Sequence, residues 1–173
     1  MGTSSHETRW LDNEEKRAWF TLVGVITRLP AVLDDQLQHE AGISHFDYLV
    51  MARLSTAADR TLRMSVLATL AEGSLPRLSQ AVGRLERRGW VRRTPDPSDG
   101  RYTLAVLTDE GWAKVVDAAP GHVETVRRYV FDQLSPAQVR QLTSIGECIL
   151  RALPPDQTWP TEKWAPPNGM CQE

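Results

Sequence analysis

The 173-residue sequence contains only two cysteines and no run of apolar residues long enough to cross a membrane, which takes about 18 to 20 of them. Cys148 and Cys171 are too few for a disulfide framework or a cysteine-based metal cluster. The N-terminal stretch MGTSSHETRW lacks the basic and apolar regions of a signal peptide. We therefore expect a cytoplasmic protein of bacterial type, with both thiols reduced and no membrane contact.

Sequence signatures of catalysis are also missing. The chain has no Gly-rich phosphate loop, no His-x-x-x-His pair and no nucleophile elbow. Its four histidines are scattered, which argues against a zinc site; they are His6, His39, His45 and His122. We expect neither an enzyme nor a bound metal or cofactor.

The charge is small in total and uneven along the chain. A net charge of -2, with 41% apolar and 24% charged residues, is typical of a globular protein of this length. Residues 53–101 hold ten arginines and five acidic residues, a local net charge of +5. The remainder carries ten basic and seventeen acidic residues, a net charge of -7. A basic middle in an acidic frame suggests local contact with a polyanion.

Capping signals and hydrophobic periodicity predict a long first helix. Asp12 starts it, with Glu15 three residues later in a capping-box arrangement. Apolar residues then follow the helical period as far as Gly42, which we expect to end the helix. Pro30 should bend this helix, because its ring removes a backbone donor and crowds the preceding turn.

The rest of the chain predicts five further helices and one β-hairpin. Each of these helices follows a Ser or Thr, whose side chain can accept a hydrogen bond from the first turn. Pro120 and Gly121 are expected to kink or break the fifth helix. The predicted elements are helices from Ser44, from Ser65 and from Ser74 to Gly89, strands at 90–94 and 102–107, and helices from Thr108 and Ser135.

Two of these helices, joined by AEGS, have the spacing of a helix-turn-helix. On a wheel of the second helix, a stripe within an arc of about 80° should face the core; it comprises Leu75, Leu78, Val82 and Leu85. The opposite face carries Gln and Arg, whose hydrogen-bonding groups match purine edges in the major groove. The candidate DNA contacts here are Arg77, Gln80 and Arg84, together with Ser65 and Ser74 at the helix starts.

The hexapeptide DPSDGR lies between two short apolar runs, so a hairpin follows the helix-turn-helix directly, as in a winged helix. Arg101 at the exit of the turn is expected to enter a minor groove, where negative potential attracts arginine. Asp99 would hold its guanidinium in one rotamer, whereas Asp96 is expected to be a turn residue. Arg92 and Arg93 at the base of the wing would contact phosphates.

The segments LRMSVLATL, LSQAVGRLERRGWVRR and DPSDGRYTLAVLTDEG together resemble the MarR family of bacterial transcriptional regulators, over about residues 12–153. The most specific part is the wing pattern D-P-x-D-x-R followed by L-T-x-x-G. Many members have a second arginine where this chain has Gly100, which leaves Arg101 to make the wing contact. The resemblance implies a homodimer that presents two winged helices to a pseudo-palindromic operator. It also implies a repressor that a small ligand releases from DNA.

The expected fold is mainly α (α+β), a winged helix-turn-helix with long N- and C-terminal dimerisation helices. An independent argument supports the dimer, because the first and last two helices carry more apolar surface than one winged helix can cover. The predicted division is an N-terminal tail at 1–11, the first dimerisation helix at 12–42, the winged helix-turn-helix DNA-binding domain at 43–107 with its wing at about 90–107, the C-terminal dimerisation helices at 108–153 and a disordered Pro-rich tail at 154–173.

The resemblance places an effector pocket between the dimerisation helices and the winged helix. Trp19, His45 and Tyr48 are the polar aromatic residues expected to line it, with Arg28 or Asp47 as a charge partner. Such a lining suits a phenolic compound or another aromatic carboxylate. The alternative is that Trp19 and Tyr48 are core residues and His45 a surface residue.

Sensing of oxidants is not expected. Peroxide-sensing relatives carry a cysteine near the start of the first helix, and this chain has none there. Cys148 lies on an apolar stretch and is expected to be inert packing.

A second function remains open from the sequence alone. A winged helix can act as a protein-binding module, a co-regulator without sequence-specific DNA binding, and solvated helix faces also explain surface arginines. A protein-binding face would favour aromatic anchors over the Gln and Arg set found here. Binding to duplex DNA should weaken steeply with added salt, and this dependence separates the two functions.

Overall fold

The computed structural model describes residues 8–153, so the tail at 154–173 and residues 1–7 lie outside the described part. The fold confirms the mainly helical prediction, with a winged helix-turn-helix between a long first helix and two last helices. The elements are α1 (Asn13–Ala41), α2 (His45–Thr56), the 3-10 turn η1 (Ala58–Arg60), β1 (Thr61–Arg63), α3 (Met64–Leu70), α4 (Leu75–Arg87), β2 (Val91–Pro95), β3 (Thr103–Leu107), α5 (Asp109–Tyr129), the 3-10 turn η2 (Phe131–Gln133) and α6 (Pro136–Ala152).

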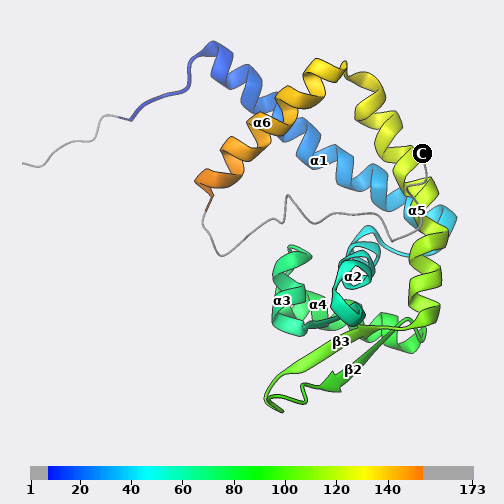
Figure 1. The fold of residues 1–173 in the computed structure, drawn as a ribbon. Coiled ribbons are helices and arrows are strands. Elements are labelled where there is room, and N and C mark those ends of the chain that lie inside the picture. The colour runs from blue at the N-terminus through cyan, green and yellow to red at the C-terminus, as the bar shows by residue number, and fades with distance from the viewer. Residues whose placement is uncertain (1–7, 154–173) are drawn as a thin grey trace, which may run out of the picture.

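The helices form two groups that α5 connects. Figure 1 shows α2, α3, α4 and the strands gathered at one end, whereas α1 and α6 extend at the other. The first half of α5 belongs to the lower group, where its Val115 packs into the core. The core also takes fully buried side chains from α1, α2, α3 and α4; the largest are Leu37, Met51, Leu54, Leu67, Leu78 and Leu85.

The helix ends follow their local sequence signals. The Asp12 side chain accepts hydrogen bonds from the backbone N–H groups of Glu14 and Glu15, and the Glu15 carboxylate accepts one from the Asp12 N–H. Gly42 ends α1 with φ of 65°, a left-handed conformation that suits glycine. The predicted capping side chains of the later helices are confirmed at Ser44, Ser74, Thr108 and Ser135.

One predicted cap is wrong, and one strand was not foreseen. Ser65 does not cap α3, because the helix begins one residue earlier and the N-cap position belongs to Arg63, which makes no side-chain cap bond. Residues 61–63 pair antiparallel with β3 as the short strand β1, which moves the helix start to Met64. The hairpin is therefore part of a three-stranded sheet in the order β1-β3-β2. Three residues are too few to show the alternating pattern of a strand.

Pro120 and Gly121 do not break α5, which runs from Asp109 to Tyr129. The proline removes one backbone hydrogen bond, and the α5 ribbon changes direction near its midpoint (Figure 1). Gly121 allows close packing, since a Cβ there would overlap the Glu40 carboxylate and lie 3.0 Å from Gln36 Nε2. Both groups are the ends of flexible α1 side chains, so a larger residue at this position would require these two side chains to move.

The L-T-x-x-G pattern fastens α5 to the end of α4. The Thr108 hydroxyl donates to the Gly89 carbonyl at 2.7 Å and accepts from the Gly111 N–H at 3.0 Å. The Thr108 N–H donates to the Trp90 carbonyl at 3.0 Å. A Cβ at Gly111 would overlap that same carbonyl oxygen. The first turn of α5 therefore rests directly on the backbone that leads into the wing.

Gly111→Ala should lower the free energy of unfolding by about 1–3 kcal/mol, because the new methyl group meets a fixed backbone oxygen. Helix propensity alone predicts the opposite sign, a gain of up to about 1 kcal/mol. Urea denaturation measures the difference. Ala113→Gly, at an exposed position of the same helix, gives the size of the propensity effect, and a stabilised Gly111→Ala chain would contradict the proposed packing.

Candidate nucleic-acid interface

The helix-turn-helix is formed by α3, a short turn and α4. Glu72 in the turn has φ of 51°, and a Cβ on the following Gly73 would lie 2.6 Å from Phe46 Cζ, so the turn needs a glycine at that position. Ser74 then caps α4 by accepting from the Arg77 N–H. Leu78, Ala81, Val82 and Leu85 are buried beneath the helix, which leaves its opposite face open.

Leu75 was expected in this core stripe, and that prediction is wrong. Its side chain is 51% exposed, whereas Leu78 and Val82 are completely buried. A wheel gives the direction of a side chain around the helix, but not where along the helix the neighbouring elements cease to cover it. At the first residue of α4, the neighbouring elements leave about half of Leu75 exposed.

Two arginines of α4, and Arg88 at its C-cap, contact the elements behind the helix. Arg84 donates from Nη2 to the nearly buried carboxylate of Asp47 at 2.8 Å. The Arg77 guanidinium lies 4.0 Å from the centre of the Phe46 ring. Arg88 donates to the Gly42 carbonyl at 2.8 Å. These contacts fix the rotation of α4 against α2 and the end of α1.

Two other side chains on α4 are available for a partner. Within residues 8–153, the exposed side chains of Gln80 and Arg87 make neither a hydrogen bond nor an ion pair. Arg84 was predicted to contact DNA as Gln80 does, but its pairing with Asp47 leaves only part of its guanidinium free. Of the predicted contacts on α4, Gln80 is therefore the one whose side chain is least committed to partners within the described part of the chain.

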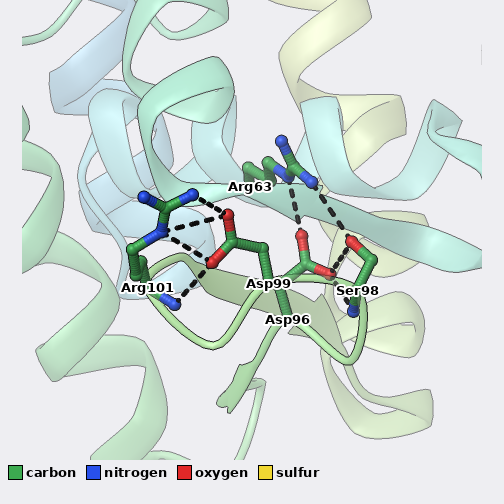
Figure 2. A network of polar contacts seen from close by, with 5 residues as sticks. All are labelled: Arg63, Asp96, Ser98, Asp99 and Arg101. Atoms are coloured by element: carbon green, nitrogen blue, oxygen red, sulfur yellow. Dashed lines mark hydrogen bonds and ion pairs between the residues drawn. The ribbon is translucent and has the colours of Figure 1, made fainter.

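The wing presents Arg101 as the sequence suggests. Arg101 donates to both carboxylate oxygens of Asp99, from Nε at 2.9 Å and from Nη2 at 2.7 Å (Figure 2). These hydrogen bonds lower the pKa of Asp99 and raise the pKa of Arg101. The Arg101 side chain is nevertheless 85% exposed. Asp99 thus orients a guanidinium that stays open to solvent.

Arg63 is a residue of the wing surface that the sequence did not reveal. Its Nε donates to Asp96 Oδ2 at 2.7 Å and its Nη2 to Ser98 Oγ at 3.4 Å (Figure 2). Its guanidinium also lies 4.6 Å from the centre of the Tyr102 ring. Asp96 is buried, and its pKa is lowered to about 2, chiefly by hydrogen bonds from Ser98, with Arg63 adding to the effect. Asp96 is therefore a turn residue that also anchors the wing to β1.

The base of the wing contains two arginines in different situations. Arg93 donates from Nη2 to the Ser79 carbonyl of α4 at 2.7 Å and lies 3.4 Å from the Glu86 carboxylate. Arg92 is exposed, and its side chain has no hydrogen bond or ion pair among the described residues. Arg93 thus joins the wing to α4, and Arg92 remains the predicted phosphate contact.

A groove of about 310 Å³ lies between α4 and the wing. Three guanidinium groups line it, from Arg63, Arg93 and Arg101, and Ser65 adds a hydroxyl. Ser65 thus belongs to the same surface as the wing, although it does not cap a helix. In this cationic groove each arginine is also paired with a carboxylate, and Arg101 is the one of the three that is mostly exposed. A surface rich in arginine is expected where a protein binds a phosphate backbone.

The predicted effector residues do not meet in the single chain. A hollow of about 710 Å³ between α1, α2 and α4 is lined by His45 but by neither Trp19 nor Tyr48. Tyr48 is buried in the core, and burial raises its pKa to about 12. Trp19 is half exposed and stands 15 residues before Asp34, the α1 residue beside His45, or about 22 Å along the helix.

The two predicted charge partners also separate. Arg28 lines a different hollow, of about 600 Å³, between α1, the end of α5 and α6. Asp47 does not line the hollow beside His45, but its ion-pair partner Arg84 does. A ligand in that hollow would meet the arginines Arg77 and Arg84 together with the carboxylates of Asp34 and Glu72.

Behind this hollow, His122 of α5 is buried against α2. Its ring lies 4.6 Å from the Tyr48 ring and 5.7 Å from the His45 ring, centre to centre. Its Nδ1 is buried without a hydrogen-bond partner. Burial, with a smaller contribution from the neighbouring His45, lowers the pKa of His122 to about 4. The neutral ring is therefore part of the packing between α5 and α2.

A helix-turn-helix with a basic three-stranded wing defines the chain as a winged helix-turn-helix protein. The sequence model of the MarR family matches residues 42–101, from the end of α1 to Arg101. Within the described part of the chain, no helix is both long and apolar enough to span a membrane.

Comparison with known proteins extends the likeness over nearly the whole chain. The chain is 43% identical to Sco3205, a MarR family transcriptional regulator from Streptomyces coelicolor crystallised in complex with DNA; the match covers 90% of this chain and 99% of that one, with a TM-score of 0.83. AbsC, another MarR family regulator of that organism, is 36% identical over 84% and 97%, with a TM-score of 0.79. The transcriptional regulator PecS of Dickeya dadantii (strain 3937) is 28% identical over 75% and 78%. The chain belongs to the MarR family of DNA-binding transcriptional regulators, which are not enzymes.

The buried histidine predicts a pH-dependent stability. The pKa of His122 falls from 6.5 to about 4 on folding, so the unfolded chain binds the proton first. The stabilisation is complete above pH 6.5 and is lost as the pH falls towards 4, by up to about 3 kcal/mol. Urea unfolding at several pH values should show this slope, and His122→Phe should flatten it.

His39→Gln is the matched control for this experiment, because the His39 side chain is exposed on α1. It should leave the slope as it is in the parent chain. A His122→Phe chain with the parent slope would show that another group causes the pH dependence.

Proposed function

We propose that the chain binds a pseudo-palindromic operator in double-stranded DNA as a homodimer, represses nearby genes, and leaves the DNA when a small effector binds. The observation that carries the proposal is the cationic groove between α4 and the wing, with Arg101 held open at its edge. The complex of the similar Sco3205 with DNA supports the same function for this surface. Operator DNA lies in the bacterial cytoplasm, where we place the chain.

The contacts divide by chemistry. Gln80 faces base edges in the major groove, where its amide can pair with adenine. Arg101 enters the neighbouring minor groove, in the orientation that Asp99 sets. Phosphate contacts come from the flanks and fix the register of the helix; we assign them to Ser65, Ser74, Arg77, Arg84 and Arg92.

The homodimer follows from the exposed apolar surface of the long helices. None of the 17 residues of α6 is buried in the single chain, and a helix of that length is marginal in water without packing. Large apolar side chains are also exposed on α1 and near the end of α5; with those of α6, they include Phe20, Ile26, Tyr129, Leu142, Ile145 and Ile149. A second copy would cover them, and two-fold symmetry would present two winged helices to half-sites about one helical turn apart.

The effector is proposed to bind in the hollow of about 710 Å³ beside His45. Arg77, Gln80 and Arg84 of the recognition helix line the same hollow. An aromatic carboxylate there would pair with a guanidinium and stack on an aromatic ring, and would engage the side chains that DNA needs. Mutual exclusion of DNA and effector follows, since coupling between two sites is reciprocal. Trp19 and Tyr48 remain predicted contacts that the single chain does not bring to this hollow.

Arg101→Ala should weaken operator binding about 10- to 100-fold, because it removes one minor-groove contact of roughly 1–3 kcal/mol from each subunit. Fluorescence anisotropy with an operator duplex selected by this protein measures the affinity and gives the stoichiometry, expected to be two chains per duplex. The parent affinity should fall steeply between 50 and 200 mM salt, as expected when several phosphates are neutralised.

Arg127→Ala is the control, since it removes an exposed arginine on α5 whose partner is Asp132. Its affinity should stay within about twofold of the parent chain's, as is usual for a surface change away from the interface. Equal affinities of the parent and Arg101→Ala chains would rule out the role of the wing. An affinity independent of salt would instead favour a protein-binding module.

The effector site has its own test. Benzoate and the hydroxybenzoates, titrated as probes, should raise the melting temperature and displace the operator. His45→Ala should weaken this effect about tenfold, because one hydrogen bond to a charged group is lost, and should leave binding of ligand-free protein to DNA unchanged. Displacement by the probes that is equal in both chains would place the effector elsewhere.

A further inference from the structure

Leu75 is an exposed leucine at the first residue of the recognition helix. Its position is fixed, because the Ser74 hydroxyl caps the helix immediately before it. One turn later, Leu78 is completely buried, yet Leu75 is 51% exposed. The local backbone thus holds a large apolar side chain in solvent at the end of α4 where a helix-turn-helix meets base edges.

The surroundings of Leu75 are polar and cationic. Leu75 lines both the groove towards the wing and a second groove, of about 530 Å³, along α3. The first also contains Arg63, Arg93, Arg101 and Tyr102, and the second contains Thr69, Glu72 and Ser74. Of the residues that line the two grooves, Leu75 and Tyr102 are the large apolar ones that stay exposed, and the Arg63 guanidinium lies over the Tyr102 ring. Leu75 is therefore an aliphatic side chain exposed in a surface rich in arginine, which does not match the continuous apolar patch of a protein interface.

We propose that Leu75 determines sequence specificity by contacting the 5-methyl group of a thymine in each half-site. This inference rests on the proposed DNA binding. The thymine methyl is the apolar group that a base pair presents in the major groove, where every other recognition group is a hydrogen-bond donor or acceptor. If cytosine, adenine or guanine stood at this position, Leu75 would cover a hydrogen-bond donor or acceptor of the base without forming a hydrogen bond to it. This loss of hydration costs free energy. Leu75 therefore favours thymine in two ways: it contacts the thymine methyl group, and it disfavours the other bases by covering their polar groups.

Replacing thymine by deoxyuridine tests this contact directly, because the change removes the methyl group and keeps the base pair. Operator duplexes selected by the full-length protein receive one deoxyuridine at a time, and anisotropy gives each affinity. We expect one thymine per half-site at which the change weakens binding by the parent chain about fourfold, the loss expected for one methyl group left unburied. A 5-methylcytosine placed there should bind more tightly than cytosine.

The variant that completes the experiment is Leu75→Ala. It should fold normally, since the side chain is half exposed, and a thermal melt checks this. At the sensitive position it should bind thymine and deoxyuridine equally, while the other positions keep the parent pattern. Leu75→Met retains an apolar side chain of similar size and should retain the sensitivity. Val66→Ala removes an exposed apolar side chain from α3 and should also retain it.

Each outcome supports or overturns the assignment. A parent chain that binds its operator with no position sensitive to deoxyuridine, or a sensitivity that survives in Leu75→Ala, overturns it and leaves the proposed DNA binding intact. A uniform loss of affinity for all sequences in Leu75→Ala also overturns it, because it assigns Leu75 to packing. Failure of the parent chain to select any operator overturns the proposed function itself.

Discussion

The buried carboxylate of Asp47 determines how the DNA-binding surface is oriented. A carboxylate removed from water needs a cationic partner, and Arg84 of α4 supplies it at 2.8 Å. Because the pair joins α2 to α4, the rotation of the recognition helix is set from the interior of the domain. The wing is positioned in turn from α4, through the hydrogen bond of Arg93 to Ser79, and from β1 through Arg63. Arginines therefore stabilise the packing between elements of this domain, in addition to being candidate contacts for a partner.

This double use of arginine explains much of what the sequence could and could not predict. Caps such as Asp12 with Glu15 depend on neighbours three residues apart, and they formed as predicted. The pair of Asp99 and Arg101 in the wing could also be predicted from the sequence, because the two residues are only two positions apart. The partners of Arg63 and Arg84 lie 33 and 37 residues away, so no local pattern indicates them. An arginine on an open helix face gives the same sequence signal whether it is free or paired.

Core and pocket predictions failed for a related reason. The helical period predicted the buried stripe of α4 correctly from Leu78 to Leu85 but included Leu75, because periodicity does not show where covering elements end. Residues as far apart in the chain as Trp19 and Tyr48 share a pocket only if the tertiary packing allows it. In the single chain, the length of α1 keeps Trp19 distant. Strand β1 was missed because pairing with β3, rather than its own three residues, creates it.

The exposed state of α6 has a consequence for how such a regulator responds to its own abundance. In the proposed homodimer, α6 gains its packing from the second copy, which couples folding to association, so the folded fraction rises with total protein concentration. Chains without a partner would expose an apolar surface to chaperones and proteases. The cell would then hold either competent pairs or rapidly cleared chains. Occupancy of a promoter would rise more steeply than in proportion to synthesis, which sharpens switching without any added component.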